Sequence, residues 1–232
     1  MASPPEITLQ NLNGVFVLNK SLSTDTDAIL ALQGIGWLMR KAISVATVTL
    51  AISETVQPNS DDPANAPVTK IVVNQTATGN IKSTESRTAD WRVRPHTDRI
   101  FGSINGQSRL IRASKPDAGD GKVRPSVDVQ TTPKEEKIVK FLKGEVDLEG
   151  NPDDGFIVDE IEDKDGVSYG EGEGLWLQNW VKSEAGWTAE QIWGFETING
   201  QRWHTRRLVV TDKSGKWLIG RLVYDYQGPN EQ

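Results

Sequence analysis

Alternating apolar and polar positions recur along most of this chain, and a period of two predicts β-strands. The clearest run lies near the C-terminus, where Asn199-Gly200 separates two alternating segments and gives a strong hairpin signal. A second two-residue turn is expected at Ser214-Gly215. Together these turns predict three antiparallel strands, at 187–198, 201–213 and 216–226.

Two-residue turns at both places would fix the register of these strands, and therefore the side chains that share a face. One face mixes aromatic groups with Arg, His and Gln, which is typical of the inside of a barrel that holds a ligand. The opposite face carries Arg207, Tyr224 and Tyr226, among others. The members of the mixed face are Gln191, Trp193, Phe195, His204, Arg206, Leu208, Ile219, Arg221, Val223 and Asp225.

The first half of the chain shows the same alternation, interrupted once by helical spacing. A short strand is expected at 14–20, and apolar residues three and four apart then predict helices within 21–43. Gly34 and Gly36 divide this stretch into two short helices. Further strands are expected at 46–56, 68–78, 84–94 and 99–112.

An antiparallel meander of this kind removes its sheet edges most simply by closing into a barrel. The sequence therefore predicts a mainly β protein. We expect an antiparallel up-and-down, calycin-like β-barrel of about nine or ten strands, with a short helical pair after the first strand.

Residues 113–173 break the alternation, because they carry several prolines, many glycines and few aromatic residues. Within this segment, residues 144–173 contain twelve Asp or Glu against one Lys, and 134–143 can form a short amphipathic helix. We therefore expect one domain, 1–232, with an acidic insertion at 113–173. The insertion is either a solvated, partly flexible surface segment or a lid over a pocket.

Composition narrows the possible functions. The 232 residues carry a net charge of −6, no cysteine and two histidines, which argues against nucleic-acid binding and against a metal site. No cofactor motif is present. The N-terminus lacks a signal-peptide pattern, and no apolar stretch approaches the ~20 residues of a membrane span. We expect a cytoplasmic protein whose partner is a small hydrophobic molecule, without cofactor or metal; the oligomeric state stays open.

Several stretches resemble known families. Gly14–Ser23 followed by Asp27–Ala42 resembles the opening of intracellular fatty-acid-binding proteins: a strand, two helices with Gly-x-Gly between them, and Arg-Lys-Ala before the next strand. Trp187–Glu196 and Arg221–Tyr226 are similar to segments of fungal lipocalin-like proteins. The resemblance spans about residues 10–112 and 175–226 and is moderately specific for the fold.

The resemblance to fatty-acid-binding proteins implies an interior that binds a small hydrophobic molecule, and this is our primary hypothesis. Some fungal lipocalin-like proteins are pericyclases, including Diels–Alder catalysts. The alternative is therefore a cofactor-free cyclase that acts on a polyketide or terpenoid in fungal secondary metabolism. A chain without metal ligands, cofactor motif or nucleophile elbow fits both hypotheses.

One departure from the fatty-acid binders concerns their final Arg-x-Tyr, which holds the ligand carboxylate. Here Arg221 and Tyr224 are three residues apart, so on a regular strand they point to opposite faces. In the predicted register Arg206 shares a face with Arg221, and two guanidiniums would suit a carboxylate, enolate or phenolate. The alternative is that these arginines lie outside, or pair with Glu85, Asp90 or Asp225.

The same register places His204 opposite Asp225, an arrangement suited to a general base, with a structural histidine as the alternative. His96 follows Pro95 in an expected turn and should be exposed. The candidate catalytic residues are His204, Arg206, Arg221 and Asp225. The candidate ligand-binding residues are Trp37, Trp91, Gln191, Trp193, Phe195, Leu208, Trp217 and Tyr224.

The register yields a direct test. Arg206→Ala should weaken ligand binding or turnover far more than Arg207→Ala, because adjacent residues of a strand point to opposite faces. Ligand titration of the two folded variants measures the difference. Equal losses would contradict the register or the barrel.

Overall fold

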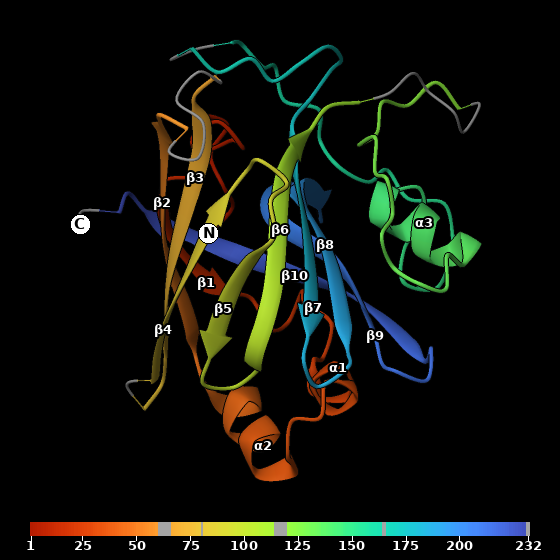
Figure 1. Ribbon diagram of the computed structural model, residues 1–232. Helices are drawn as coiled ribbons and strands as arrows, with labels where there is room; N and C mark the ends of the chain where they lie inside the picture. Colours follow the sequence, from red (N-terminus) through yellow and green to blue (C-terminus); the bar gives the residue numbers. More distant parts are fainter. Residues whose placement is uncertain (60–65, 80, 114–119, 164–165, 231–232) are drawn as a thin grey trace.

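The computed structural model describes residues 1–59, 66–79, 81–113, 120–163 and 166–230. Ten strands form one antiparallel sheet in the order β4-β3-β2-β1-β10-β9-β8-β7-β6-β5, curled into a nearly closed barrel (Figure 1). The strands are β1 (Gly14–Leu18), β2 (Val48–Gln57), β3 (Val68–Ala77), β4 (Ile81–Thr88), β5 (Arg94–Asp98), β6 (Gly102–Ile111), β7 (Trp176–Ser183), β8 (Thr188–Ile198), β9 (Gln201–Thr211) and β10 (Trp217–Gly228).

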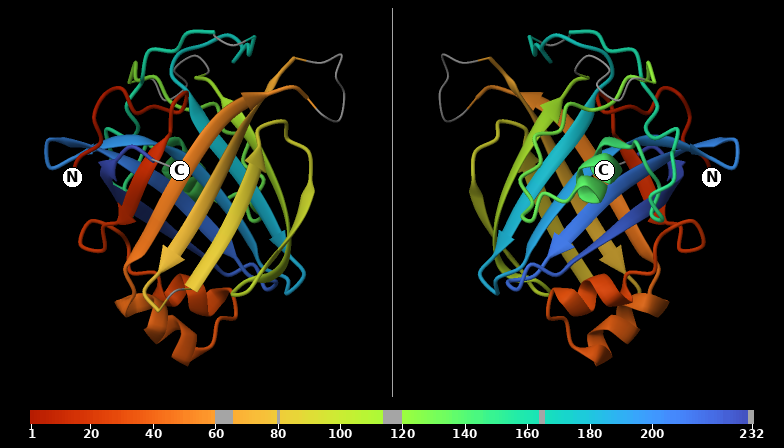
Figure 2. Two further views of the ribbon diagram at one scale, coloured as in Figure 1. Left: turned by 90° about the vertical axis from the view of Figure 1, so that its left-hand side faces the viewer. Right: turned by 90° about the vertical axis from the view of Figure 1, so that its right-hand side faces the viewer.

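Three helices accompany the barrel: α1 (Asp27–Leu32), α2 (Trp37–Val45) and α3 (Glu136–Lys143). The first two lie at one end of the barrel, and α3 lies on its side (Figure 2). None of these helices, within the described ranges, is long and apolar enough to cross a membrane. The predicted up-and-down barrel with a helical pair after the first strand is confirmed.

Two details of the strand assignment differ from the prediction. The strand expected at 84–94 ends at Thr88 as β4, and β5 at Arg94–Asp98 was not predicted as a separate strand. Trp91 lies between them with a φ of 59°. A residue other than glycine rarely adopts this left-handed conformation, so regular strand geometry cannot continue through it. Strand β7 was not predicted separately.

The β8–β9 hairpin has the predicted two-residue turn. Ile198 pairs with Gln201, and Asn199 and Gly200 have φ values of 53° and 73°. Positive φ at both turn residues is the conformation that matches the twist of the flanking strands. The register predicted for these two strands is confirmed.

The β9–β10 turn was predicted wrongly. Trp217 pairs with Thr211, so the loop contains five residues, 212–216, instead of two. The Asp212 carboxylate stabilises this longer loop, because its Oδ1 accepts hydrogen bonds from the Ser214 and Lys216 backbone N–H groups at 2.8 and 3.1 Å. The pairing of β10 is therefore displaced by one residue.

A displacement of one residue exchanges the faces of every side chain on β10. Tyr224 pairs with His204, and Leu222 pairs with Arg206. Tyr224 and Leu222 therefore lie on the inner face. Arg221 pairs with Arg207 on the outer face, which also takes Ile219, Val223 and Asp225. The predicted pair His204–Asp225 therefore does not form, and Arg221 does not share a face with Arg206.

The segment 120–163 lies against the outer face of the barrel. Ile138 and Leu142 of α3 pack against Ile192 and Val209, which point outward from β8 and β9. Further along, Val167 and Tyr169 are buried in the same apolar cluster as interior residues of the barrel. The segment 120–163 therefore covers one side of the barrel, and Val167 and Tyr169 of the same insertion pack with interior residues. A lid role for the insertion stays a prediction.

Buried charges on the outer face join this segment to the sheet. The Arg207 side chain is fully buried and contacts the carboxylates of Glu196 and Asp153 at 2.9 and 2.6 Å. Its Nη1 also donates to the backbone oxygens of Phe141 and Val146. Arg221 adds a second cation to Glu196 at 3.1 Å. Each of these charges has a partner, so the loss of any one of them would leave a buried charge uncompensated.

Removal of one buried partner should be costly. Arg207→Met should lower the free energy of unfolding by roughly 3–5 kcal/mol, because the Glu196 carboxylate loses its main counter-charge while buried. Urea unfolding measures the change. Lys140→Ala is the matched control, since the Lys140–Glu136 pair is exposed and should contribute little. A loss in Arg207→Met as small as that in the control would contradict a structural role for the cluster.

Candidate functional site

The interior of the barrel has apolar regions at both ends and polar groups between them. At one end, Phe16, Ile52 and Phe195 belong to one apolar cluster. Near α1, Trp187, Ala189 and Leu208 belong to another. The polar side chains between these clusters come from β4 to β9, and they define the candidate site.

A cavity of about 490 Å³ lies mainly against β4 to β8, with Gln57 of β2 and Lys70 of β3 also in its lining. Its polar wall includes Glu85 and Arg87 of β4, His96 of β5, and Ser108 of β6. Apolar groups complete the wall. These apolar residues are Phe101, Ile104, Val181, Trp187 and Ala189. The side-chain amides of Asn179 and Gln191 also line the cavity. Most of the lining residues are polar or charged, and the apolar residues form a smaller part of the wall. Such a cavity is suited to a small organic molecule that carries polar groups.

Two guanidinium groups lie over the buried indole of Trp193. The Arg206 Cζ is 3.5 Å from the ring centroid and the Arg87 Cζ is 4.8 Å from it. Arg87 forms an ion pair with Glu85, whose pKa is lowered mainly by the charge of Arg87. Arg206 is buried, and its Nε and Nη2 have no hydrogen-bond partner among the described residues. Burial lowers the pKa of Arg206.

An aromatic cage surrounds His204. The rings of Phe16, Phe195 and Tyr224 each lie 5.4 Å from its ring, and that of Trp193 lies at 6.0 Å. Its Nδ1 is 3.0 Å from the Gly194 carbonyl oxygen, which can only accept, so Nδ1 carries the proton. Burial, followed by the charge of Arg206, holds the pKa of His204 well below its ordinary range. His204 is therefore neutral at pH 7.

Two side-chain amides face each other on the cavity wall. Asn179 and Gln191 are directly paired between β7 and β8. The Trp193 indole N–H donates to Gln191 Oε1 at 2.8 Å, and the Ser108 hydroxyl donates to Asn179 Oδ1 at 2.6 Å. Asn179 Nδ2 is buried with no hydrogen-bond partner among the described residues. Both amide oxygens are thus occupied, and the amide nitrogens remain as donors.

The structure divides the sequence-derived candidates into two groups. One group lies on the inner face of β8 to β10, as the paired registers show: Gln191, Trp193, Phe195, His204, Arg206, Leu208 and Tyr224. Of these residues, Gln191 lines the cavity. The others form the polar and aromatic interior next to it.

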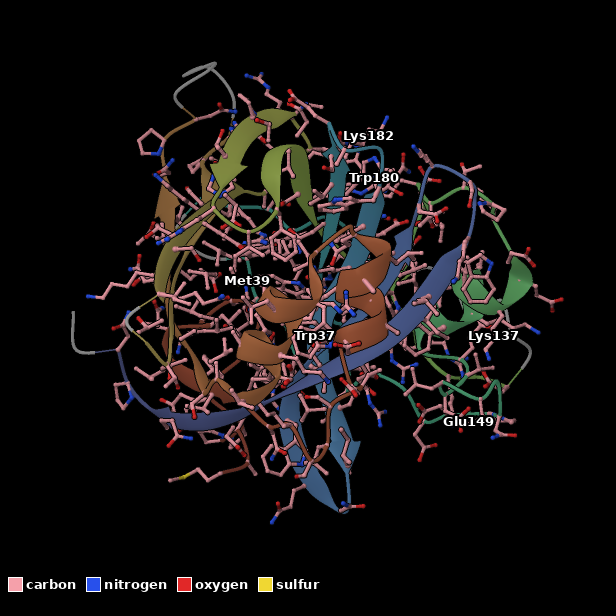
Figure 3. All side chains as sticks on the ribbon, turned by 90° about the horizontal axis from the view of Figure 1, so that it is seen from below. Trp37, Met39, Lys137, Glu149, Trp180 and Lys182 are labelled. Carbon is pink, nitrogen blue, oxygen red and sulfur yellow. The ribbon has the colours of Figure 1, made fainter. Side chains whose placement is uncertain are left out.

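The remaining candidates lie elsewhere. Arg221 and Asp225 point outward because of the displaced register, and Trp217 belongs with the outer apolar cluster for the same reason. Trp91 lies against the outward-facing Arg109, whose Cζ is 4.1 Å from its ring centroid. Trp37, on α2 at the barrel end, is 63% exposed (Figure 3). Trp91 and Trp217, two of the candidate ligand-binding residues, therefore lie outside the interior.

The structure also changes the expected contrast between the Arg206→Ala and Arg207→Ala variants. The two side chains point to opposite faces, as predicted. Arg207, however, is not a neutral control, because it is the buried cation of the outer cluster. Loss of Arg207 should act through stability, whereas loss of Arg206 should act on the interior.

Part of the polar wall was not predicted as a site. Glu85 was predicted only as a possible ion-pair partner of an arginine, and Arg87 was not predicted to have a role. Their spacing of two within 84–94 nevertheless places them on one face of a strand. His96 was expected to be exposed but is partly buried, and its Nε2 has no hydrogen-bond partner among the described residues. Asn179 and Ser108 carried no sequence signal beyond alternation.

Two curated relatives are similar to almost the whole chain. A probable pericyclase of Mollisia scopiformis, scpY, is 28% identical over 228 residues, which covers 98% of this chain and 96% of the relative. The pericyclase pydY of an Acremonium species is 26% identical over 231 residues, which covers 99% and 98%. No protein-family model matches the chain. The chain is thus a distant relative of two fungal pericyclases.

Solved structures with some similarity include fatty-acid-binding proteins. A Schistosoma mansoni fatty acid binding protein in complex with arachidonic acid is 10% identical, with a TM-score of 0.45 and coverage of 93% of this chain and 96% of that one. The fluorescent protein UnaG is 9% identical, with the same TM-score and coverage. The strand order of this chain by itself defines the barrel.

The neutral state of His204 predicts a pH effect on stability. Because its pKa is lowered in the folded protein, the unfolded chain binds a proton below about pH 6.5 that the folded protein does not bind. Stability is therefore fully present above this pH and falls as the pH drops, by up to about 1.4 kcal/mol per pH unit.

Urea unfolding of the natural protein and of His204→Phe, between about pH 7.5 and 5.5, measures this contribution. The variant should lose less stability over this range, since carboxylates affect both proteins alike. Parallel pH dependence in the two proteins would contradict a neutral buried His204.

Proposed function

We propose that the protein is a pericyclase, a cofactor-independent cyclase that folds a linear unsaturated molecule in its barrel and closes a ring. The observation that carries the proposal is the similarity to two pericyclases along nearly the full chain. This similarity favours the cyclase over the simple binding module as the primary hypothesis. The proposed substrate is a polyketide- or terpenoid-derived polyene of fungal secondary metabolism.

The reaction class makes modest demands on a protein. In a Diels–Alder cyclisation two carbon–carbon σ bonds form from π bonds of the same molecule, and no atom, proton or electron leaves it. No nucleophile or acid–base pair is needed. Holding the reacting ends together can supply about 7 kcal/mol or more of the barrier. A cavity of about 490 Å³ next to aromatic side chains supports this role.

The cavity wall offers different surfaces to the two parts of such a substrate. Phe101, Ile104 and Trp187 provide apolar contacts for the hydrocarbon chain. Arg87 and the amides of Asn179 and Gln191 provide positive charge and donors for an oxygen atom. Fixed donors near an oxygen that gains negative charge in the transition state lower the barrier.

Filling the cavity should abolish turnover. Gly106 lines the cavity, and a Cβ at this position meets only Val181 Cγ2, at 3.9 Å, so Gly106→Leu should fold and occupy the space. Asn105→Leu, the exposed neighbour on the outer face of β6, is the matched control. The measurement begins with native mass spectrometry and extraction of the small molecule bound to protein from its natural producing cells.

The linear isomer of that molecule is then incubated with each protein. We expect one stereoisomer of the cyclic product from the natural protein and from Asn105→Leu, and background cyclisation with Gly106→Leu. A fatty acid or sterol recovered unchanged, with no cyclisation above background, would contradict the proposal and support a carrier.

A further inference from the structure

We infer that Gln191, with Asn179 beside it, donates the hydrogen bonds that hold a carbonyl oxygen of the substrate, and that Trp193 positions Gln191 for this task. The inference rests on the proposed cyclase function and identifies the substrate as a carbonyl-bearing polyene. It assigns catalytic contact to two amides on adjacent strands, β7 and β8.

The orientation of the Gln191 amide is fixed by its neighbour on the same face of β8. An indole N–H can only donate, and that of Trp193 lies 2.8 Å from Gln191 Oε1. A flipped amide would bring two donors together. The Oε1 is therefore occupied, and the Nε2 hydrogens have no acceptor among the described residues. Since Gln191 lines the cavity, its Nε2 is available to a ligand there.

Trp193 is itself held firmly. Its side chain is fully buried, and the Arg206 guanidinium lies 3.5 Å from the ring centroid. The guanidinium of Arg87 approaches the same ring, at 4.8 Å. An indole anchored in this way cannot turn to release Gln191, so the amide is preorganised before any substrate binds.

Asn179 supplies the second donor. It is 2% exposed and pairs directly with Gln191 across the β7–β8 ladder. Ser108 occupies its Oδ1 at 2.6 Å, and its Nδ2 has no partner among the described residues. Buried donors are normally paired, so an unpaired one on a cavity wall points to an acceptor supplied by the ligand. A carbonyl oxygen has two lone pairs and can accept from both amides.

The chemistry of the proposed reaction explains the use of such donors. Hydrogen bonds to a carbonyl conjugated with the dienophile withdraw electrons from its double bond and accelerate attack by the diene. The two π bonds of the diene and the π bond of the dienophile are consumed, and two σ bonds and one new π bond form within the same molecule. No proton is transferred, so amides, which neither gain nor lose protons at pH 7, are sufficient.

The test uses a linear ketone with an enone at one end and a conjugated diene at the other, labelled with carbon-13 at the carbonyl. Infrared difference spectra report the carbonyl stretch of the bound ketone, and product analysis reports cyclisation. With the natural protein the stretch should lie at a lower wavenumber than with Gln191→Glu. This variant keeps the acceptor for Trp193 and loses the donor, so its cyclisation rate should fall on the order of 100-fold.

Two further variants define the roles. Trp193→Phe should broaden the carbonyl band and lower kcat more than it changes KM, because the amide is free to flip while the cavity wall remains. Gln201→Glu, at an exposed position of β9, is the matched control and should leave the band and the rate unchanged.

The outcomes separate the two proposals. Cyclisation by the natural protein with a carbonyl stretch equal to that in Gln191→Glu would overturn the carbonyl anchor and retain the cyclase. A lowered stretch without cyclisation would retain the anchor and contradict the cyclase. Failure of the natural protein to bind the ketone would overturn the anchor.

Discussion

The register between β9 and β10 is the constraint on which the interior depends. The loop at 212–216, stabilised by the Asp212 carboxylate, decides that Tyr224 faces His204 inside the barrel and that Arg221 faces Arg207 outside it. A register shifted by one residue would exchange the inner and outer side chains of β10. It would bring Arg221 into the interior and leave the outer Glu196 with one cation instead of two.

The sheet thereby separates two polar systems that differ in hydrogen bonding. On the outer face the buried carboxylate of Glu190 accepts from Gln178, from Thr131 and from the backbone N–H of Gln130. Together with the Arg207 cluster, these contacts hold the segment 120–163 in place. On the inner face Arg206, Asn179 and His96 retain nitrogen atoms without partners among the described residues. The outer contacts thus hold the segment 120–163 against the barrel, whereas the unpaired nitrogens of Asn179 and His96 belong to residues that line the cavity.

This division suits a reaction in which the protein acts by shape and fixed dipoles. Arg206 and Arg87 stabilise Trp193, Trp193 orients Gln191, and Gln191 reaches the cavity. Each contact in this series is a packing or hydrogen-bond contact that exists before a ligand binds. Preorganisation of this kind reduces the cost of aligning donors during the reaction. The segment 120–163 packs against the outer side of β8 and β9 through Ile138 and Leu142.

The sequence alone determined the β-meander, the helical pair and the β8–β9 hairpin, because periodicity and the Asn199-Gly200 turn are local properties. It also determined that Gln191, Trp193, His204 and Arg206 share a face. Only the tertiary structure decided the face of β10 and the cavity wall. The face of β10 depended on a loop whose length was set by hydrogen bonds to the Asp212 carboxylate. The cavity wall depended on strands that are far apart in the sequence, and periodicity cannot specify which strands become neighbours.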